Sequence, residues 1–398
     1  MNSLDDPFRI ASRLSGVSES TTLKLNASIQ AMRAAGMDII NLTAGEPDFA
    51  VHPLVKEAAI QAVRSDKSKY TPVPGIPELR DAIAAKTNKQ QPSLVRIKPW
   101  THGDVIVGNG GKQALFNAFM ILLEHGDEVL MPSPYWLSYP EMVKVAGGVP
   151  RVIPTSTSSG FKMTPDQLEK ALGPKVRIVI LNSPSNPTGA VYSREELAAL
   201  GKVLQKPRWS QTLIVSDEIY DRIVFEELGF CSFLEAVPEL RDRTITVNGM
   251  SKSAAMTGWR VGWAIAPRPY VEAMTALQGQ STSGVNALAQ WASVAALKLP
   301  DSEFVPQVES YRKRRNLALE NLGKTSKLDI VVPQGAFYIF MGVGEDSVVF
   351  TERLLGEGMV ALVPGSSFGE PNFVRLTFSI DEKSLAEGCR RIVRYLNR

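Results

Sequence analysis

The chain has 398 residues, of which 44% are hydrophobic and 21% charged, a composition typical of globular proteins and not of disordered or fibrous ones. This length exceeds what one hydrophobic core usually organises, so we expect a large domain and a smaller one. The net charge of +3 is spread thinly along the chain, which disfavours nucleic acid as a partner.

The cysteines and the N-terminus bear on the compartment. Cys231 and Cys389 are the two cysteines, and their wide separation fits neither a disulfide framework nor a zinc site. Residues 1–7 begin acidic and lack the apolar region of a secretory signal. The most apolar stretch, residues 114–123, is too short to span a bilayer. We therefore expect a cytoplasmic protein without a membrane segment or a bound metal.

The pattern of strand-like and helical stretches up to about residue 267 predicts a protein built on a β-sheet. Residues 1–50 precede the sheet pattern, and we expect them to pack with the smaller domain. From about residue 104 to 267, short β-branched runs alternate with helical stretches, which indicates a mostly parallel sheet. Several runs are apolar at consecutive positions, as strands covered on both faces should be. The predicted strands are residues 105–107, 128–130, 176–181, 213–215, 244–247 and 261–265, and the predicted helices are residues 112–124, 164–172 and 193–205.

Beyond residue 300 the pattern changes. A long amphipathic stretch over residues 303–322 is followed by an apolar segment at 334–340 and a closing helix near 384–396. We therefore predict an α/β fold with a mostly parallel central sheet flanked by helices and a smaller α+β domain formed by both termini. The predicted boundaries are 1–50 for the N-terminal segment, 51–298 for the large domain and 299–398 for the C-terminal small domain.

Lys252 is followed by Arg260 eight residues later. A primary amine forms a Schiff base with an aldehyde cofactor, and a guanidinium group can grip that cofactor's phosphate with two hydrogen bonds. The pair therefore suggests pyridoxal 5′-phosphate (PLP). Most lysines are solvated surface groups, so this spacing alone leaves the ordinary alternative open.

Polar residues follow two of the predicted strands. In an open parallel sheet, ligands bind at the carboxyl ends of strands. Asn186 lies in the turn after the strand that ends at residue 181, and Asp217 ends the next strand, with Tyr220 one helical turn later. A buried aspartate beside a pyridinium nitrogen would keep that ring protonated and electron-withdrawing, and Asn186 and Tyr220 could bond the ring's phenolic oxygen. The alternatives are a plain turn for Asn186 and a helix cap for Asp217.

A glycine-rich turn containing Gly108, Gly110 and Gly111 leads from a strand into a helix that starts near Lys112. Glycines let backbone N–H groups approach an anion, and a helix N-terminus adds a positive partial charge. The glycine spacing does not match the dinucleotide fingerprint G-x-G-x-x-G. A strand-to-helix turn without a ligand is the alternative.

Trp136 and Arg375 are two further candidates. Trp136 follows the strand near residue 130 and could stack on a planar ring, or be an ordinary core tryptophan. Arg375 is a charge inside an apolar strand, so it requires a partner. That partner is either a substrate carboxylate or an internal Asp or Glu.

Together these motifs resemble the class I, fold-type I PLP-dependent aminotransferases, and most closely the bacterial aspartate aminotransferase subgroup that includes the Thermus-type enzyme. The match spans nearly the whole chain. The motifs that carry it are residues 42–49, 69–70, 74–80, 110–116, 133–140, 182–189, 216–220, Lys252, 257–260 and 374–376.

The resemblance implies a role for each residue around the cofactor. Lys252, Asp217 and Tyr220 would be catalytic, with Lys252 forming the Schiff base and Asp217 pairing with the pyridine nitrogen. Asn186 and Tyr220 would hold the ring oxygen, and Trp136 would stack on the ring. The phosphate would be held by Gly110, by backbone N–H groups at Gly111 and Lys112, by Arg260 and, from a second subunit, by Tyr70, which implies a homodimer with shared active sites.

The resemblance also assigns the substrate pocket. Arg375 would bind the α-carboxylate, and the residues lining the same pocket would be Gly45, Trp136 and Asn186. Enteric and animal aspartate enzymes hold the distal carboxylate with an arginine of the neighbouring subunit, and residues 280–286 contain none. For the Thermus-type subgroup, the resemblance implies that the distal carboxylate is held jointly by the residues that correspond to Lys112, Ser20 and Thr22.

A second departure from the enteric pattern is Gly249, which stands where those enzymes have a phosphate-binding serine. Ser251 is the candidate substitute. We expect a phosphate contact from Ser251 on this basis.

The predicted function is amino-group transfer between an L-amino acid, with aspartate as the first choice, and 2-oxoglutarate by a ping-pong mechanism. Lys252 would be both covalent partner and general base. The alternatives are a prephenate or aromatic amino-acid aminotransferase, a PLP-dependent lyase on the same fold, and a non-catalytic aminotransferase-like binding protein.

Overall fold

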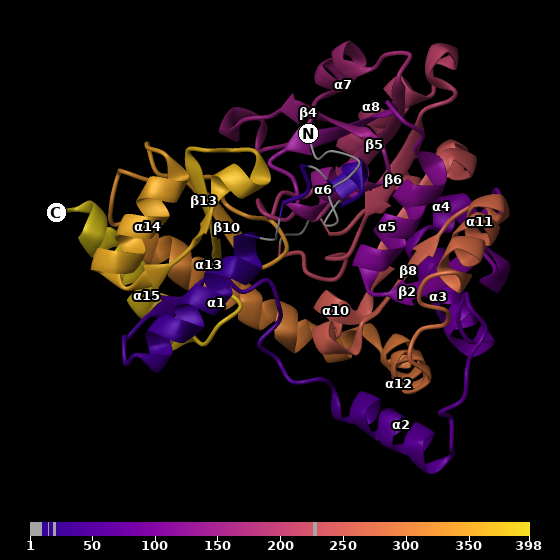
Figure 1. The fold of residues 1–398 in the computed structure, drawn as a ribbon, viewed down its shortest axis with the longest axis horizontal. Coiled ribbons are helices and arrows are strands. Elements are labelled where there is room, and N and C mark those ends of the chain that lie inside the picture. The colour runs from indigo at the N-terminus through magenta and orange to yellow at the C-terminus, as the bar shows by residue number, and fades with distance from the viewer. Residues whose placement is uncertain (1–9, 15, 19–20, 226–228) are drawn as a thin grey trace.

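The structure is a computed structural model that describes residues 10–14, 16–18, 21–225 and 229–398. Figure 1 shows a large body built on one sheet and, at one end of the molecule, a group of C-terminal elements. The helices of that group are α13 (Val305–Leu322), α14 (Ser347–Gly358) and α15 (Glu382–Leu396). Within the described residues, no helix has the length and apolar character that crossing a membrane requires.

The central sheet has seven strands in the order β2-β8-β7-β6-β5-β3-β4. Their bounds are β2 Val105–Asn109, β3 Glu128–Ser133, β4 Val149–Pro154, β5 Val176–Asn182, β6 Leu213–Asp217, β7 Thr244–Gly249 and β8 Val261–Ile265. Neighbouring strands from β7 to β4 run parallel, whereas β8 runs antiparallel to β2 and β7. The prediction of a mostly parallel sheet is confirmed. Strand β4 was not predicted, because two prolines interrupt its sequence and prolines are confined to positions such as this sheet edge.

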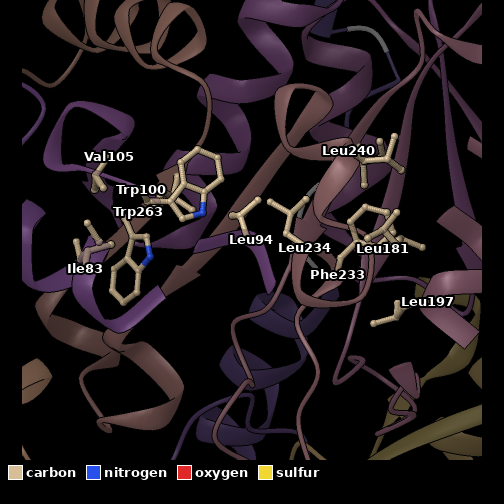
Figure 2. Close-up of a cluster of buried hydrophobic side chains, with 14 of the residues drawn as sticks. Ile83, Leu94, Trp100, Val105, Leu181, Leu197, Phe233, Leu234, Leu240 and Trp263 are labelled. Carbon is tan, nitrogen blue, oxygen red and sulfur yellow. The ribbon is translucent and has the colours of Figure 1, made fainter. Parts of the chain in front are cut away.

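The consecutive apolar residues of the strands are explained by packing on both faces of the sheet. In β5, Val179 and Leu181 join one buried cluster, and Ile178 and Ile180 join another. Figure 2 shows part of the first cluster, where the tryptophans Trp100 and Trp263 and several leucines pack together. Strands covered in this way need no polar face.

Helices cover the sheet. They are α3 Pro77–Gln90, α4 Pro92–Val95, α5 Gly111–Leu122, α6 Ser138–Val145, α7 Pro165–Ala171, α8 Arg194–Leu204, α9 Phe233–Ala236, α10 Met250–Ser253, α11 Arg268–Gly279 and α12 Ala287–Lys298. Helix α2 (Pro53–Arg64) packs on α12 at the margin of the molecule. Helix α8 begins with a capping box, in which Ser193 Oγ accepts from Glu196 N at 3.2 Å and Glu196 Oε2 accepts from Ser193 N at 2.8 Å.

The C-terminal elements form a second sheet with the order β12-β13-β10-β9. Its strands are β9 Asp329–Ile330, β10 Tyr338–Gly342, β12 Val363–Pro364 and β13 Phe373–Thr377. Near the N-terminus, α1 (Thr21–Ala34) precedes β1 (Ile40–Asn41), which pairs parallel with β11 (Val360–Ala361). This pairing places residues 40–41 beside the C-terminal elements, while the domain boundaries at residues 50 and 298 stay predictions.

Candidate active site

Polar strand ends meet around a cavity of about 470 Å³. Strands β2, β5, β6 and β7 end at one edge of the sheet, and β8, which runs the other way, starts there. Residues that follow the first four strands and residues that precede β8 therefore converge. The predicted residues that line this cavity are Gly45, Gly111, Lys112, Trp136, Asn186, Asp217, Tyr220, Ser251, Lys252, Arg260 and Arg375.

Lys252 reaches the cavity from α10, which begins directly after β7. Its Nζ donates a hydrogen bond to the Gly45 carbonyl oxygen. Burial, together with the charges of Arg375 and Arg260, lowers the pKa of Lys252 to about 8. A neutral amine is therefore accessible near physiological pH, as a nucleophile or general base requires.

Asp217 is buried at the end of β6. Its Oδ2 accepts a hydrogen bond of 2.6 Å from the Tyr139 hydroxyl, and its Oδ1 accepts one of 3.2 Å from Ile219 N. Burial raises the pKa of Asp217 to about 6, and the hydrogen bond from Tyr139 opposes that rise. Tyr139 was not predicted as a site residue, although it lies one helical turn after Trp136, against whose ring it packs edge-on at 5.4 Å.

Arg375 is buried on β13 and is held by neutral groups. Its Nη1 donates to Asn186 Oδ1 and its Nη2 to the Thr43 carbonyl oxygen, each at 2.9 Å, and its Cζ lies 4.4 Å from the centre of the Tyr338 ring. Its Nε has no hydrogen-bond partner among the residues that the structure describes. Among the described residues no internal carboxylate pairs with Arg375, so its charge stays available for a ligand.

Tyr220 and Tyr338 form a second polar contact in the cavity. Their hydroxyl oxygens lie 2.9 Å apart, and both side chains are buried. Tyr338 was not predicted as a site residue, because it lies in the mostly apolar run of residues 335–340. Its position beside Arg375 depends on how β10 and β13 pair.

The glycine turn before α5 lies against Arg260. Gly110 has a φ of 81°, and a β-carbon there would lie 2.6 Å from Arg260 Nη2. Arg260 donates to the carbonyl oxygens of Thr257 at 2.9 Å and Asn109 at 3.1 Å. The first N–H groups of α5 and this guanidinium group together form a site for an anion.

Two further glycines let the strands approach this turn. A β-carbon at Gly262 in β8 would overlap the backbone of Gly110 and Gly111, and one at Gly249 would lie 3.0 Å from Gly262 Cα. A serine at position 249 would therefore push against the neighbouring strand. Ser251, the candidate substitute, lines the cavity.

Lys112 presents a second cation to the cavity. Its Nζ lies 5.1 Å from the centre of the Trp136 ring, and burial, together with the charge of Arg260, lowers its pKa. Lys112 has no ion-pair partner in the described part of the chain. It also lines an adjoining cavity of about 880 Å³, which shares Leu137, Ser138 and Arg260 with the first.

The chain matches the family described as aminotransferase class I and II over residues 37–392. It belongs to this family. The chain is 41% identical to a probable aspartate/prephenate aminotransferase from Aquifex aeolicus, covering 97% of this chain and 98% of that protein. Among solved structures, the aspartate aminotransferase from Rhizobium meliloti has a TM-score of 0.93 at 39% identity, covering 98% of this chain and 99% of that one. The Thermus thermophilus aspartate aminotransferase with maleate has a TM-score of 0.90 at 40% identity, with coverages of 97% and 99%.

The chain is therefore a PLP-dependent aminotransferase, whose substrates are small molecules of the amino acid and keto acid classes. The cavity suits a planar, phosphorylated cofactor. The turn at Gly110 with Arg260 offers an anion site, Trp136 an aromatic face, and Asp217 a buried carboxylate. Lys252 supplies the amine in the same cavity.

The remaining predicted residues of the aminotransferase either do not line the cavity or fall outside the described part of the chain. Tyr70 is 100% exposed and does not line it. Ser20 lies outside the described residues, and so does the side chain of Thr22, whose backbone belongs to α1. Glu46 does line the cavity, where its Oε2 accepts a hydrogen bond of 2.9 Å from Thr257 Oγ1, although it was not predicted as a site residue.

Proposed function

We propose that this aminotransferase transfers the amino group of aspartate to 2-oxoglutarate by a ping-pong mechanism. The observation that carries the proposal is the pair Arg375 and Lys112. Both line the cavity that contains Lys252, and neither has a carboxylate partner in the described part of the chain. Two cations without internal partners suit a substrate with two carboxylates. The names of the relatives, which include aspartate aminotransferases, support the same substrate.

In this proposal the chain holds the cofactor ring by three kinds of contact. Bound PLP supplies an aldehyde carbon and an electron-withdrawing ring. Asp217 keeps the ring nitrogen protonated, because a buried carboxylate favours a cation beside it. Asn186 and Tyr220 hold the ring oxygen, and Trp136 stacks on the ring face.

The phosphate lies at the N-terminus of α5 in the same proposal. It is held by Gly110, by the backbone N–H groups of Gly111 and Lys112, by Ser251 and Arg260, and by the partner subunit's Tyr70. This last contact makes the homodimer part of each active site. The full exposure of Tyr70 on the single chain is compatible with such a role.

Lys252 performs the proton transfer in the proposed reaction. With PLP bound, the Lys252 amine would be the base that takes the proton from the substrate Cα and holds it on Nζ. Arg375, beside Gly45 and Asn186, fixes the α-carboxylate and so orients Cα. Lys112, with Ser20 and Thr22, takes the distal carboxylate. The keto acid product leaves before the second substrate enters the same site, which is the condition for ping-pong kinetics.

Transfer to prephenate or to aromatic substrates is the second candidate. The cavity of about 880 Å³ adjoins the site at Lys112 and offers room for a larger acceptor. A relative from Aquifex aeolicus bears the name probable aspartate/prephenate aminotransferase. We also propose the cytoplasm as the compartment, because the two widely separated cysteines suit a reducing environment.

A panel of amino donors with 2-oxoglutarate, and of prephenate and oxaloacetate as acceptors, tests the proposal. We expect the highest kcat/KM for aspartate with 2-oxoglutarate, and parallel double-reciprocal plots. A higher kcat/KM for phenylalanine would favour the aromatic alternative. Release of many product molecules per active site without any keto acid acceptor would indicate a lyase, because an aminotransferase stops after one, and no turnover with any pair would indicate a binding protein.

A further inference from the structure

A buried pair of tyrosines connects Arg375 with the residue proposed to hold the cofactor ring oxygen. The hydroxyl oxygens of Tyr338 and Tyr220 lie 2.9 Å apart. The centre of the Tyr338 ring lies 4.4 Å from Arg375 Cζ. The Tyr338 and Tyr220 rings pack edge-on, with their centres 5.9 Å apart. Tyr338 is 0% exposed, so water does not compete for its hydroxyl.

The proposed function determines the direction of the hydrogen bond between the tyrosines. A buried hydroxyl group needs an acceptor for its proton, and within the described residues the partner of the Tyr338 hydroxyl is that of Tyr220. If Tyr220 donates its own proton to the cofactor ring oxygen, Tyr338 must donate to Tyr220. A donor that itself accepts a hydrogen bond becomes a stronger donor.

Several charged or titratable groups face the pair. Arg375 and Glu46 act on Tyr338, while Asp217 and Arg375 act on Tyr220, and Lys252 Nζ lies 5.9 Å from the centre of the Tyr220 ring. Burial raises the pKa of Tyr338, and the charge of Arg375 opposes that rise. A carboxylate bound to Arg375 would neutralise that charge. Tyr338 would then donate less strongly.

We propose that Tyr338 is a positioning residue that transmits the occupancy of Arg375 by a carboxylate to Tyr220, and through Tyr220 to the cofactor ring oxygen. This inference rests on the proposed function. With Arg375 free, the chain of hydroxyl groups stabilises negative charge on the ring oxygen. With a carboxylate bound, that stabilisation weakens and the cofactor takes up a proton at higher pH.

The test is a pH titration of the visible absorbance of the holoenzyme, with and without saturating succinate as an unreactive dicarboxylate. Tyr338→Phe keeps the ring beside Arg375 and removes the hydroxyl. Without succinate, we expect the titration midpoint of Tyr338→Phe to lie about half a pH unit above that of the parent, a shift that corresponds to the loss of about one hydrogen bond. We also expect succinate to raise the midpoint less in Tyr338→Phe than in the parent.

Two comparisons separate this role from a structural one. In a Tyr220→Phe background, Tyr338→Phe should produce no further change, because the relay is already broken. Tyr311→Phe is a matched control, since Tyr311 is equally buried in the same cluster but its hydroxyl oxygen lies 3.2 Å from Ser379 Oγ. The titration midpoint of Tyr311→Phe should equal that of the parent.

An unchanged midpoint and an unchanged succinate response in Tyr338→Phe would overturn the inference. So would a shift that persists undiminished in the Tyr220→Phe background. Catalysis by the parent would leave the proposed function intact in both cases. A parent protein that binds no PLP would overturn the proposed function, and this inference with it.

Discussion

Lys252 lies near two arginines, and this environment makes a pH dependence testable. A lysine of ordinary pKa, about 10.4, is almost fully protonated at pH 8, whereas burial lowers the pKa of Lys252 to about 8. The neutral form reacts with an aldehyde. The rate of PLP capture by the apoprotein should therefore rise about tenfold per pH unit below pH 8 and then level off, as followed by stopped-flow absorbance. A rate that keeps rising beyond pH 9 would contradict the lowered pKa.

In the proposed function, selection of a dicarboxylate substrate depends on Lys112. Lys112→Ala should raise the KM for aspartate about tenfold, the size of one charge-assisted hydrogen bond, and leave the KM for phenylalanine nearly unchanged. Steady-state kinetics with both donors measure the difference. Lys144→Ala is the matched control, because Lys144 lines the adjoining cavity but already pairs with Glu141 at 3.0 Å. An equal rise for both donors would remove Lys112 from acid recognition.

At the scale of elements, the reversed strand β8 determines where Arg260 lies. Because β8 runs antiparallel to β2 and β7, its first residue lies at the edge where those strands end. Arg260 directly precedes β8 and so reaches the glycine turn before α5. A parallel β8 would carry Arg260 to the opposite edge. The orientation of this strand therefore completes the anion site.

Gly262 in β8 is expected to be sensitive to substitution. Gly262→Ala would press a β-carbon into the backbone of Gly110 and Gly111, and overpacking of this kind costs about 1–3 kcal/mol of unfolding free energy. We expect a lower urea midpoint for the apoprotein and weaker PLP binding. Gly258→Ala is the control, since nothing lies within 4 Å of a β-carbon there. Equal unfolding free energies of the two variants would show that the turn adjusts to the added β-carbon without a loss of stability.

At the scale of the whole molecule, the proposed homodimer predicts complementation between inactive chains. Lys252→Ala and Tyr70→Ala each damage every site of their own dimer. A mixed dimer would contain one site with Lys252 from one chain and Tyr70 from the other. Refolding an equal mixture should restore about a quarter of the parent activity at limiting PLP, as random pairing into twofold dimers requires. Activity equal to the mean of the separate variants would show that Tyr70 does not act across an interface.

The sequence by itself determined the sheet class and most of the residues around the cavity. Lys252, Asp217 and Asn186 could be found because each follows a recognisable apolar strand, and strand ends of a parallel sheet meet at one edge. The family resemblance then supplied roles for them. Domain boundaries at residues 50 and 298 stay predictions.

The tertiary structure alone decided which side chains touch. Tyr139 reaches Asp217 across 78 positions, Tyr220 meets Tyr338 across 118, and Arg375 meets the Thr43 carbonyl oxygen across 332. Such contacts depend on how strands pair and how the C-terminal sheet packs on the large one, and no local pattern records that. The sequence left the partner of Arg375 open for this reason, and packing showed that neutral groups hold it.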